Sequence, residues 1–202
     1  MIIKVCGLIS NKAVDSMSGV GAQWVGLNFY AKSKRFISKD FIIENNKVKK
    51  VGVFVDPTIN EIKKKFEFYN LDFIQLHGNE NKAFCQKVQS FCPVIKVFHI
   101  DKDFDFSITH EFEFCDYFLF DTATFEFGGS GEKFNWEKLD DYKGSTQFLL
   151  AGGIDENDAI SISEINHPQF LGIDINSKFE IEPGIKDPEK VKSFIGKINL
   201  KL

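Results

Sequence analysis

Short apolar and β-branched runs alternate along the whole chain with longer amphipathic stretches. Runs of this kind are typical of strands that are buried on both faces of a parallel sheet. About eight of them, spaced by roughly 20 to 30 residues, predict a (β/α)8 TIM barrel rather than an open doubly wound sheet. The predicted strands are Ile2–Cys6, Trp24–Asn28, Val51–Val55, Phe73–Leu76, Val94–Phe98, Phe118–Phe120, Phe148–Ala151 and Leu171–Ile175.

The stretches between the predicted strands contain helix signals. Pro57 is expected in the first turn of the helix that follows the third strand. Asp155 is expected to cap a helix before the eighth strand, and Asp187 followed by Pro188 predicts the start of the last helix. Residues 101–115 alternate in a strand-like way, and we expect a short or irregular fifth helix there.

The length of 202 residues fits one α/β domain that spans residues 1–202, at the small end of the range for such barrels. A dinucleotide-binding open sheet is disfavoured because no GxGxxG follows the first strand. The apolar run at the N-terminus is too short for a signal peptide, and no segment approaches the length needed to cross a bilayer. We therefore expect no membrane partner.

The charge and the cysteines narrow the possible partners. The net charge of -4 argues against nucleic acid, which requires a basic face. The four cysteines form no CxxC pair, and no histidines are paired at metal spacing, so neither a zinc site nor a disulfide framework is indicated. Reduced thiols predict a cytoplasmic protein.

Arg35 is the only arginine among 25 cationic residues. In a chain with so strong a lysine bias, a single guanidinium suggests a planar carboxylate or phosphate ligand, which a rigid fork grips better than an ammonium. Chance placement on a solvated face is the alternative. The composition alone favours the ligand-binding role.

The predicted strand over Tyr117–Phe120 ends at Asp121, and Gly128, Gly129, Ser130 and Gly131 follow. A carboxylate at a strand end beside an amide-rich loop is typical of active sites in α/β proteins. The alternative is that Asp121 only begins a turn and that the glycines only permit a positive φ.

A phosphate site is predicted near the ends of the last two strands. Gly152 and Gly153 follow the seventh strand, and Asn176, Ser177 and Lys178 follow the eighth. In barrels, phosphate binds at these loops through backbone amides and the N-terminus of a short extra helix. The alternative is that the two glycines only turn the chain.

Several motifs, in order and over nearly the whole chain, closely resemble the phosphoribosylanthranilate isomerase family. The resemblance implies a barrel and the Amadori rearrangement of N-(5-phosphoribosyl)anthranilate to 1-(2-carboxyphenylamino)-1-deoxyribulose 5-phosphate, a step of tryptophan biosynthesis. It also implies a phosphosugar substrate, no metal and no cofactor; a monomer and a homodimer both remain open. The motifs are KVCG at 4–7, SKRFIS at 33–38, LDFIQLHG at 71–78, FDT at 120–122, GGSG at 128–131, FNW at 134–136, LAGGI at 150–154, GIDINSKFE at 172–180 and PGIKD at 183–187.

Motif by motif, the resemblance assigns roles to five side chains. It implies that Cys6 is the general base and Asp121 the general acid. Arg35 would bind the anthranilate carboxylate, Asp174 would lie near the substrate amine and sugar hydroxyls, and His77 would lie at the mouth of the site. Lys4 is expected to give Cys6 no help, because neighbouring side chains on a strand point to opposite faces.

The phosphate loop departs from the family pattern. Asn176-Ser177-Lys178-Phe179-Glu180 replaces SerSerGlyValGlu, so a side chain occupies position 178 where the family has glycine. The ammonium of Lys178 would then compensate, or the affinity for phosphate would differ. Two other functions stay open: a related phosphate-binding barrel enzyme, such as an indole-glycerol-phosphate synthase, and a catalytically silent barrel that binds a phosphorylated metabolite.

Overall fold

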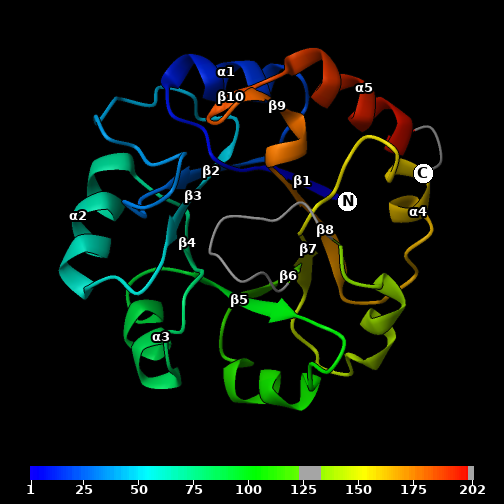
Figure 1. Cartoon of the computed structure of the whole chain (residues 1–202). Coiled ribbons are helices and arrows are strands. Elements are labelled where there is room, and N and C mark those ends of the chain that lie inside the picture. The colour runs from blue at the N-terminus through cyan, green and yellow to red at the C-terminus, as the bar shows by residue number, and fades with distance from the viewer. Residues whose placement is uncertain (123–132, 200–202) are drawn as a thin grey trace.

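The computed structural model describes residues 1–122 and 133–199. Within these residues, parallel strands pair in sequence order and close into a barrel, which confirms the predicted fold class (Figure 1). The predicted runs match the observed strands to within a few residues at each end. The strands are β1 (Ile2–Val5), β2 (Trp24–Asn28), β3 (Lys49–Phe54), β4 (Phe73–Leu76), β5 (Val94–Ile100), β6 (Tyr117–Thr122), β7 (Phe148–Leu150) and β8 (Phe170–Ile175).

Aromatic side chains fill the barrel at the ends where the strands begin. Trp24 stacks on Phe73 with ring centroids 4.6 Å apart, and Tyr117 meets both rings edge-on. These three residues come from alternate strands, β2, β4 and β6, as expected for one layer of barrel side chains. The interior of the barrel is therefore packed at this end.

The barrel closes where β1 pairs with β8 over four residue pairs, from Ile2 with Gly172 to Val5 with Ile175. The two backbones approach closely at Gly172, where a Cβ atom would lie 2.0 Å from the carbonyl oxygen of Ile2. Glycine at this position therefore allows the first and last strands to meet.

Helices form an outer layer around the barrel, except between β2 and β3 (Figure 1). Residues 29–48, all of them described, contain no helix. The irregular fifth helix expected within residues 101–115 is confirmed as a 3-10 helix. The helices are α1 (Asn11–Gly19), α2 (Ile59–Tyr69), α3 (Lys82–Gln89), η1 (Phe106–Phe112), η2 (Trp136–Asp141), α4 (Ala159–Ser163), η3 (Ser177–Phe179) and α5 (Pro188–Asn199).

Two of the predicted helix starts are wrong and one is confirmed. Pro57 precedes α2 instead of entering it, because Thr58 forms a capping box with Glu61. Asp155 does not cap α4, which begins after Asp158, because its side chain accepts from the amide of Asn157 and closes a local turn. The aspartate before α5 accepts hydrogen bonds from two amides of the first turn, as predicted.

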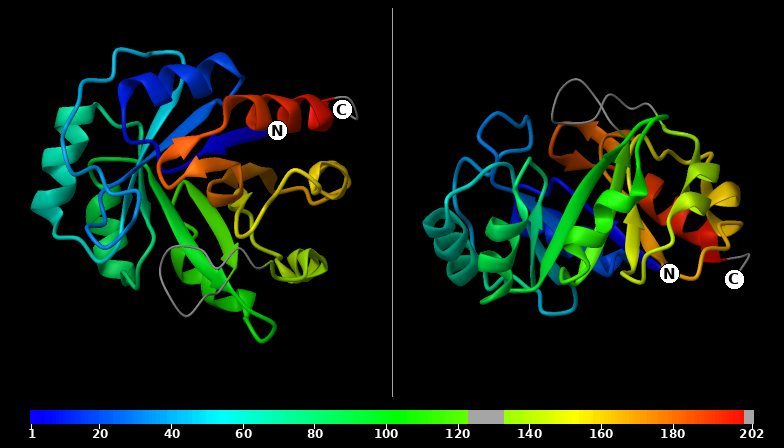
Figure 2. Two further views of the ribbon diagram at one scale, coloured as in Figure 1. Left: turned by 45° about the horizontal axis from the view of Figure 1, so that its top comes forward. Right: turned by 90° about the horizontal axis from the view of Figure 1, so that it is seen from below.

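A small antiparallel hairpin follows η3. It consists of β9 (Glu180–Glu182) and β10 (Ile185–Lys186), joined through Gly184 at a φ of 89°. The hairpin lies at the end of the barrel toward which the strand arrows point (Figure 2). It therefore delivers side chains to the same end as the strand termini.

Candidate active site

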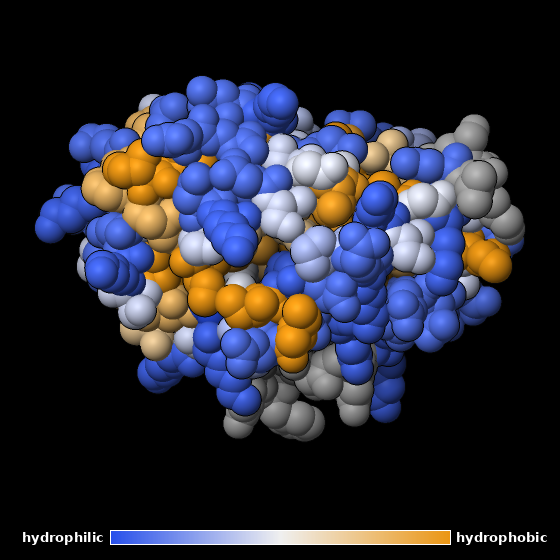
Figure 3. All heavy atoms as spheres, turned by 90° about the horizontal axis from the view of Figure 1, so that it is seen from above, coloured by the Kyte–Doolittle hydropathy of each residue, from blue (hydrophilic) through white to orange (hydrophobic). Residues whose placement is uncertain are grey.

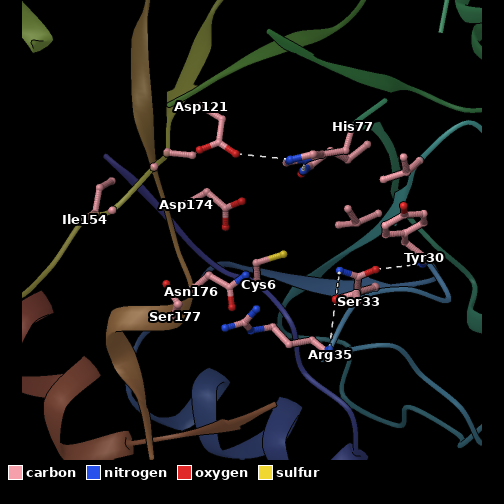
Figure 4. A pocket seen from close by; sticks show the side chains of 17 residues that line it. Cys6, Tyr30, Ser33, Arg35, His77, Asp121, Ile154, Asp174, Asn176 and Ser177 are labelled. Carbon is pink, nitrogen blue, oxygen red and sulfur yellow. Dashed lines mark hydrogen bonds and ion pairs between the residues drawn. The ribbon is translucent and has the colours of Figure 1, made fainter. Parts of the chain in front are cut away.

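A cavity with about 800 Å³ of empty space, counting the part open to solvent, lies at the carboxyl ends of the strands. Side chains from strands distant in sequence point into it (Figure 4). Of the residues predicted for the site, Lys178 does not line this cavity. The lining residues are Cys6, Asn28, Tyr30, Ser33, Arg35, Val53, Val55, Gln75, His77, Asp121, Ala151, Gly152, Gly153, Ile154, Asp174, Asn176 and Ser177.

Cys6 directly follows β1 and is almost fully buried. Gly26 on the neighbouring strand makes room for it, since a Cβ atom there would lie 2.6 Å from Cys6 Sγ. Lys4 stands two residues earlier, and side chains two apart on a strand share a face. The expectation that Lys4 faces away from Cys6 is therefore wrong: Lys4 and Cys6 interact directly.

Lys4 is completely buried and donates to Asp174, with Nζ 2.6 Å from Oδ2. Burial alone would lower the pKa of Lys4, but Asp174 and Cys6 outweigh that effect and raise it. Lys4 is therefore held as a cation beneath the cavity. The other carboxylate oxygen of Asp174, Oδ1, is buried and has no hydrogen-bond partner among the described residues.

Burial raises the pKa of the Cys6 thiol above its ordinary value. The positive charges of Lys4 and Lys186 lower that pKa without fully offsetting burial, and the carboxylate of Asp174 adds to the rise. The site thus places two ammonium groups where they stabilise a Cys6 thiolate once one forms.

Asp121 enters the cavity from β6, opposite Cys6 (Figure 4). His77 Nε2 lies 3.3 Å from Asp121 Oδ2, and His77 Nδ1 lies 2.9 Å from Gln75 Nε2. Burial and the neighbouring His77 lower the pKa of His99, which stands on the adjacent strand β5. Asp121, the predicted general acid, is therefore in contact with the imidazole of His77.

Arg35 is buried against Glu180 in a two-pronged contact, with Nε 2.8 Å from Oε1 and Nη2 2.6 Å from Oε2. Lys186 also donates to Glu180 at 2.7 Å. Burial alone would raise the pKa of Glu180, but Arg35 and Lys186 outweigh it and hold that pKa below its usual range. The hairpin of β9 and β10 therefore fixes the position of Arg35.

A turn after β2 aims Arg35 at the cavity. Asn28 Oδ1 accepts from the amide of Tyr30, and Asn28 Nδ2 donates to Ser33 Oγ at 3.1 Å. Ser33 Oγ in turn accepts from the amide of Arg35. No helix follows β2 in the described residues 29–48, and these hydrogen bonds fix the path of the backbone around Arg35 instead.

Gly152, Gly153, Asn176 and Ser177 meet at one side of the cavity, as predicted. Gly152 has a φ of 90°, and a Cβ there would lie 2.2 Å from Thr122 Oγ1, so both conformation and space require glycine. The amides of Gly152, Gly153 and Ser177 find no acceptor among the described residues. The side chain of Lys178 is exposed and lies outside this group.

The predicted glycine-rich segment Gly128–Gly131 lies outside the described residues, so its place in the site stays a prediction. Each of the four cysteines is described and is a free thiol. Among residues 1–122 and 133–199, no helix combines the length and the apolar character needed to cross a bilayer.

Several polar residues of the site were missed in the sequence, and Lys4, Glu180 and Lys186 are the charged ones. Lys4 could have been found from its position two residues before Cys6. Glu180 and Lys186 fall within the quoted motifs, but no local pattern connects them with Arg35, about 145 residues earlier. Only the hairpin after β8 brings these charges together.

Comparison with known proteins identifies the family. The family description "N-(5'phosphoribosyl)anthranilate (PRA) isomerase" matches residues 3–197. An N-(5'-phosphoribosyl)anthranilate isomerase of Parabacteroides distasonis is 45% identical over 206 residues, covering 98% of this chain and 93% of that protein. The phosphoribosyl anthranilate isomerase of Thermotoga maritima is 29% identical, with a TM-score of 0.83 over 98% of this chain and 99% of that one. A further isomerase, 26% identical with a TM-score of 0.80 over 98% and 99% of the two chains, was solved with reduced 1-(o-carboxyphenylamino)-1-deoxyribulose 5-phosphate.

Proposed function

The chain belongs to the N-(5'-phosphoribosyl)anthranilate isomerase family, and we propose that its isomerisation reaction uses Asp121 as general acid and Cys6 as general base. The enzyme is an isomerase of tryptophan biosynthesis that converts N-(5-phosphoribosyl)anthranilate to 1-(2-carboxyphenylamino)-1-deoxyribulose 5-phosphate. The observation that best supports the assignment of roles is that Cys6 and Asp121 enter one cavity from different strands.

In the first step, Asp121 protonates the oxygen of the furanose ring. The bond between that oxygen and C1′ breaks, and the nitrogen lone pair forms a protonated imine. Asp121 donates this proton as a neutral carboxyl group. His77 lies close enough to hold the resulting carboxylate.

In the second step, Cys6 removes the proton from C2′. The electrons of that C–H bond form the C1′–C2′ double bond of an enol, and the imine nitrogen takes up the displaced pair. Tautomerisation of the enol then gives the ketone. Lys4 and Lys186 support the thiolate through their positive charge, which offsets part of the effect of burial on the Cys6 pKa.

The remaining predicted contacts bind the two ends of the substrate. The amides of Gly152, Gly153 and Ser177, which have no acceptor among the described residues, fit the phosphate, and Asn176 completes that side of the cavity. Lys178 is exposed, so we assign it a backbone contact at most. Arg35 fits the anthranilate carboxylate, and the unpaired Oδ1 of Asp174 fits the substrate amine or a sugar hydroxyl.

We further propose a cytoplasmic enzyme composed of a single barrel domain, residues 1–202, with a small phosphosugar as its partner. The free thiols suit a reducing compartment. The surface in Figure 3 is mainly hydrophilic with separate apolar groups, which fits a monomer and a homodimer alike.

The loss of anthranilate-type fluorescence on mixing purified protein with freshly generated phosphoribosylanthranilate tests this proposal. We expect rapid loss with the parent enzyme. Asp121→Asn and Cys6→Ser should each reduce turnover at least about a hundredfold, the lower end for a positioned acid or base.

Turnover of either variant within a few-fold of the parent would remove that residue from its role. A folded parent protein with no activity above background would instead contradict the reaction itself and favour a silent barrel or a different phosphorylated substrate. Circular dichroism of all three proteins provides the control for folding.

A further inference from the structure

His77, His99 and Asp121 bring three potential metal ligands together at the mouth of the barrel. One donor atom from each lies within 4.8 Å of the others. The side chains come from the end of β4, from β5 and from β6, three neighbouring strands. His99 and Asp121 are register partners in the parallel pairing of β5 with β6. The cluster is therefore a product of barrel geometry rather than of sequence spacing.

The donor set suits a first-row divalent cation. Two imidazoles and one carboxylate are the ligands that Zn²⁺, Co²⁺ and Fe²⁺ commonly take in proteins. Ligands about 2.0 to 2.2 Å from a tetrahedral zinc are separated from each other by about 3.4 Å. His77 Nε2 and Asp121 Oδ2 are already 3.3 Å apart.

Bringing the His99 donor to a similar separation requires an approach of at most about 1.5 Å. His99 Nε2 lies 3.2 Å from the carbonyl oxygen of His77, a contact at the long end of hydrogen-bond distances. The approach requires a change of side-chain torsion at His99 that breaks this contact with His77.

An unpaired buried atom supports a metal-bound form of His77. When Nε2 binds a metal, Nδ1 must carry a proton and needs an acceptor. Gln75 lies 2.9 Å from that nitrogen, and its Oε1 atom is buried without a partner among the described residues. Rotation of the amide by 180° presents Oε1 to Nδ1, which supplies the acceptor that metal-binding histidines commonly have.

The surrounding charges permit a cation. Lys96 acts electrostatically on His99, but it is paired with Glu80 at 3.0 Å. Asp174 is close enough to interact electrostatically with Asp121 and His77, and it is paired with Lys4. Asp121 has no lysine or arginine partner among the described residues, and its contact there is with His77, another member of the cluster.

We propose that His77, His99 and Asp121 form a binding site for a divalent transition metal such as Zn²⁺, and that occupancy of this site inhibits the enzyme. Inhibition follows because a bound cation occupies the Asp121 oxygens that the first step of the reaction requires. The metal-binding claim concerns the three side chains alone, whereas the inhibition rests on the acid role proposed above for Asp121.

Titration of the purified enzyme with Co²⁺ alone, followed by visible absorption, tests the site without substrate. We expect the intense bands of four- or five-coordinate Co²⁺ and displacement by Zn²⁺. His99→Gln should weaken Co²⁺ binding at least tenfold, an effect on the order of losing an important ligand contact. His110→Gln is the matched control, since His110 forms an exposed pair with Glu113 at 2.9 Å.

A second readout links the site to turnover. His99 does not line the cavity, so His99→Gln should retain basal activity while Zn²⁺ inhibition moves to at least tenfold higher concentration. Equal Co²⁺ binding by the parent and His99→Gln would overturn the proposal. A thiolate-to-cobalt charge-transfer band that disappears in Cys6→Ser would also overturn it, because it would assign the metal to Cys6. If His99→Gln fails to fold, His99→Asn replaces it.

Discussion

Two opposing effects act on the pKa of the Cys6 thiol. Burial stabilises the neutral thiol, whereas the ammonium groups of Lys4 and Lys186 stabilise the thiolate, and the net result is a raised pKa. A base held in this state is protected from unselective oxidation and alkylation in the free enzyme, because the thiolate is the reactive form. The burial that protects the thiol thus also limits the amount of base present at neutral pH.

The rate at which iodoacetamide alkylates Cys6 should reflect this environment. A pKa raised in the folded protein keeps the thiol protonated to higher pH than a free cysteine, so the rate should be low near pH 7 and still rise above about pH 8.5. Peptide mass spectrometry against Cys6→Ser measures it. A plateau already reached well below pH 8.5 would show that the two lysines outweigh burial.

Arg35 already uses two of its nitrogen atoms on Glu180. Arg35→Lys replaces the planar guanidinium with a compact ammonium group, which cannot form two parallel hydrogen bonds to a carboxylate. If Arg35 binds the substrate carboxylate, this variant should raise KM about tenfold and leave kcat nearly unchanged. Steady-state kinetics beside Lys34→Ala, an exposed neighbour, provides the comparison. An unchanged KM for Arg35→Lys would exclude Arg35 as the anchor of the carboxylate.

At the scale of the elements, a substitution at Gly172 tests the closure of the barrel between β1 and β8, and a substitution at Gly196 in α5 is its control. Gly172→Ala forces a Cβ against the backbone of β1 and should destabilise the protein by about 1–3 kcal/mol. Gly196→Ala lies within α5 with no atom within 4 Å of the new Cβ, and it should stabilise by about 0.5–1 kcal/mol. Urea unfolding measures both. A stable Gly172→Ala would mean that β1 and β8 can separate without penalty.

The strands could be read from the sequence because each is a short apolar run buried on both faces. Helix starts were less predictable. Thr58 caps α2, so Pro57 lies before the helix, and the local turn at Asp155 delays the start of α4 until after Asp158. The residue at which a helix begins depends on which of several nearby polar side chains accepts a hydrogen bond from an amide of the first turn. The hydrophobic periodicity of the sequence does not show which side chain this is.

At the scale of the whole molecule, the buried pair of Lys4 and Asp174 joins the first strand to the last. Lys4→Met would leave a buried carboxylate without its partner, and we expect a loss of about 3–5 kcal/mol in the free energy of unfolding. Lys49→Met, which removes an exposed partner of Asp72, should change stability little. Denaturant titrations that gave equal losses for the two variants would contradict this difference.

Much of the candidate site could be predicted because parallel strands end at one mouth. Cys6, His77, Asp121 and Asp174 were all placed by locating strand ends or by motif, and all four line the cavity. The supporting charges could not be placed in this way, since Lys4 lies inside the barrel and Glu180 comes from a hairpin beyond β8. Their partners depend on side-chain direction in three dimensions.

The absence of a helix from residues 29–48 has a consequence for local opening of the fold. Among the described residues, the amides of residues 38–43 donate no hydrogen bond to another backbone group, and only that of Phe41 interacts with a side chain, the Tyr69 hydroxyl; Ile42 is 64% exposed. Amide hydrogen exchange should therefore be fast in this segment, as in other regions with few backbone partners. Arg35 lies at the border of this segment. Binding of a carboxylate there would slow exchange in a weakly protected segment, and the substrate would thus contribute to the rigidity of its own site.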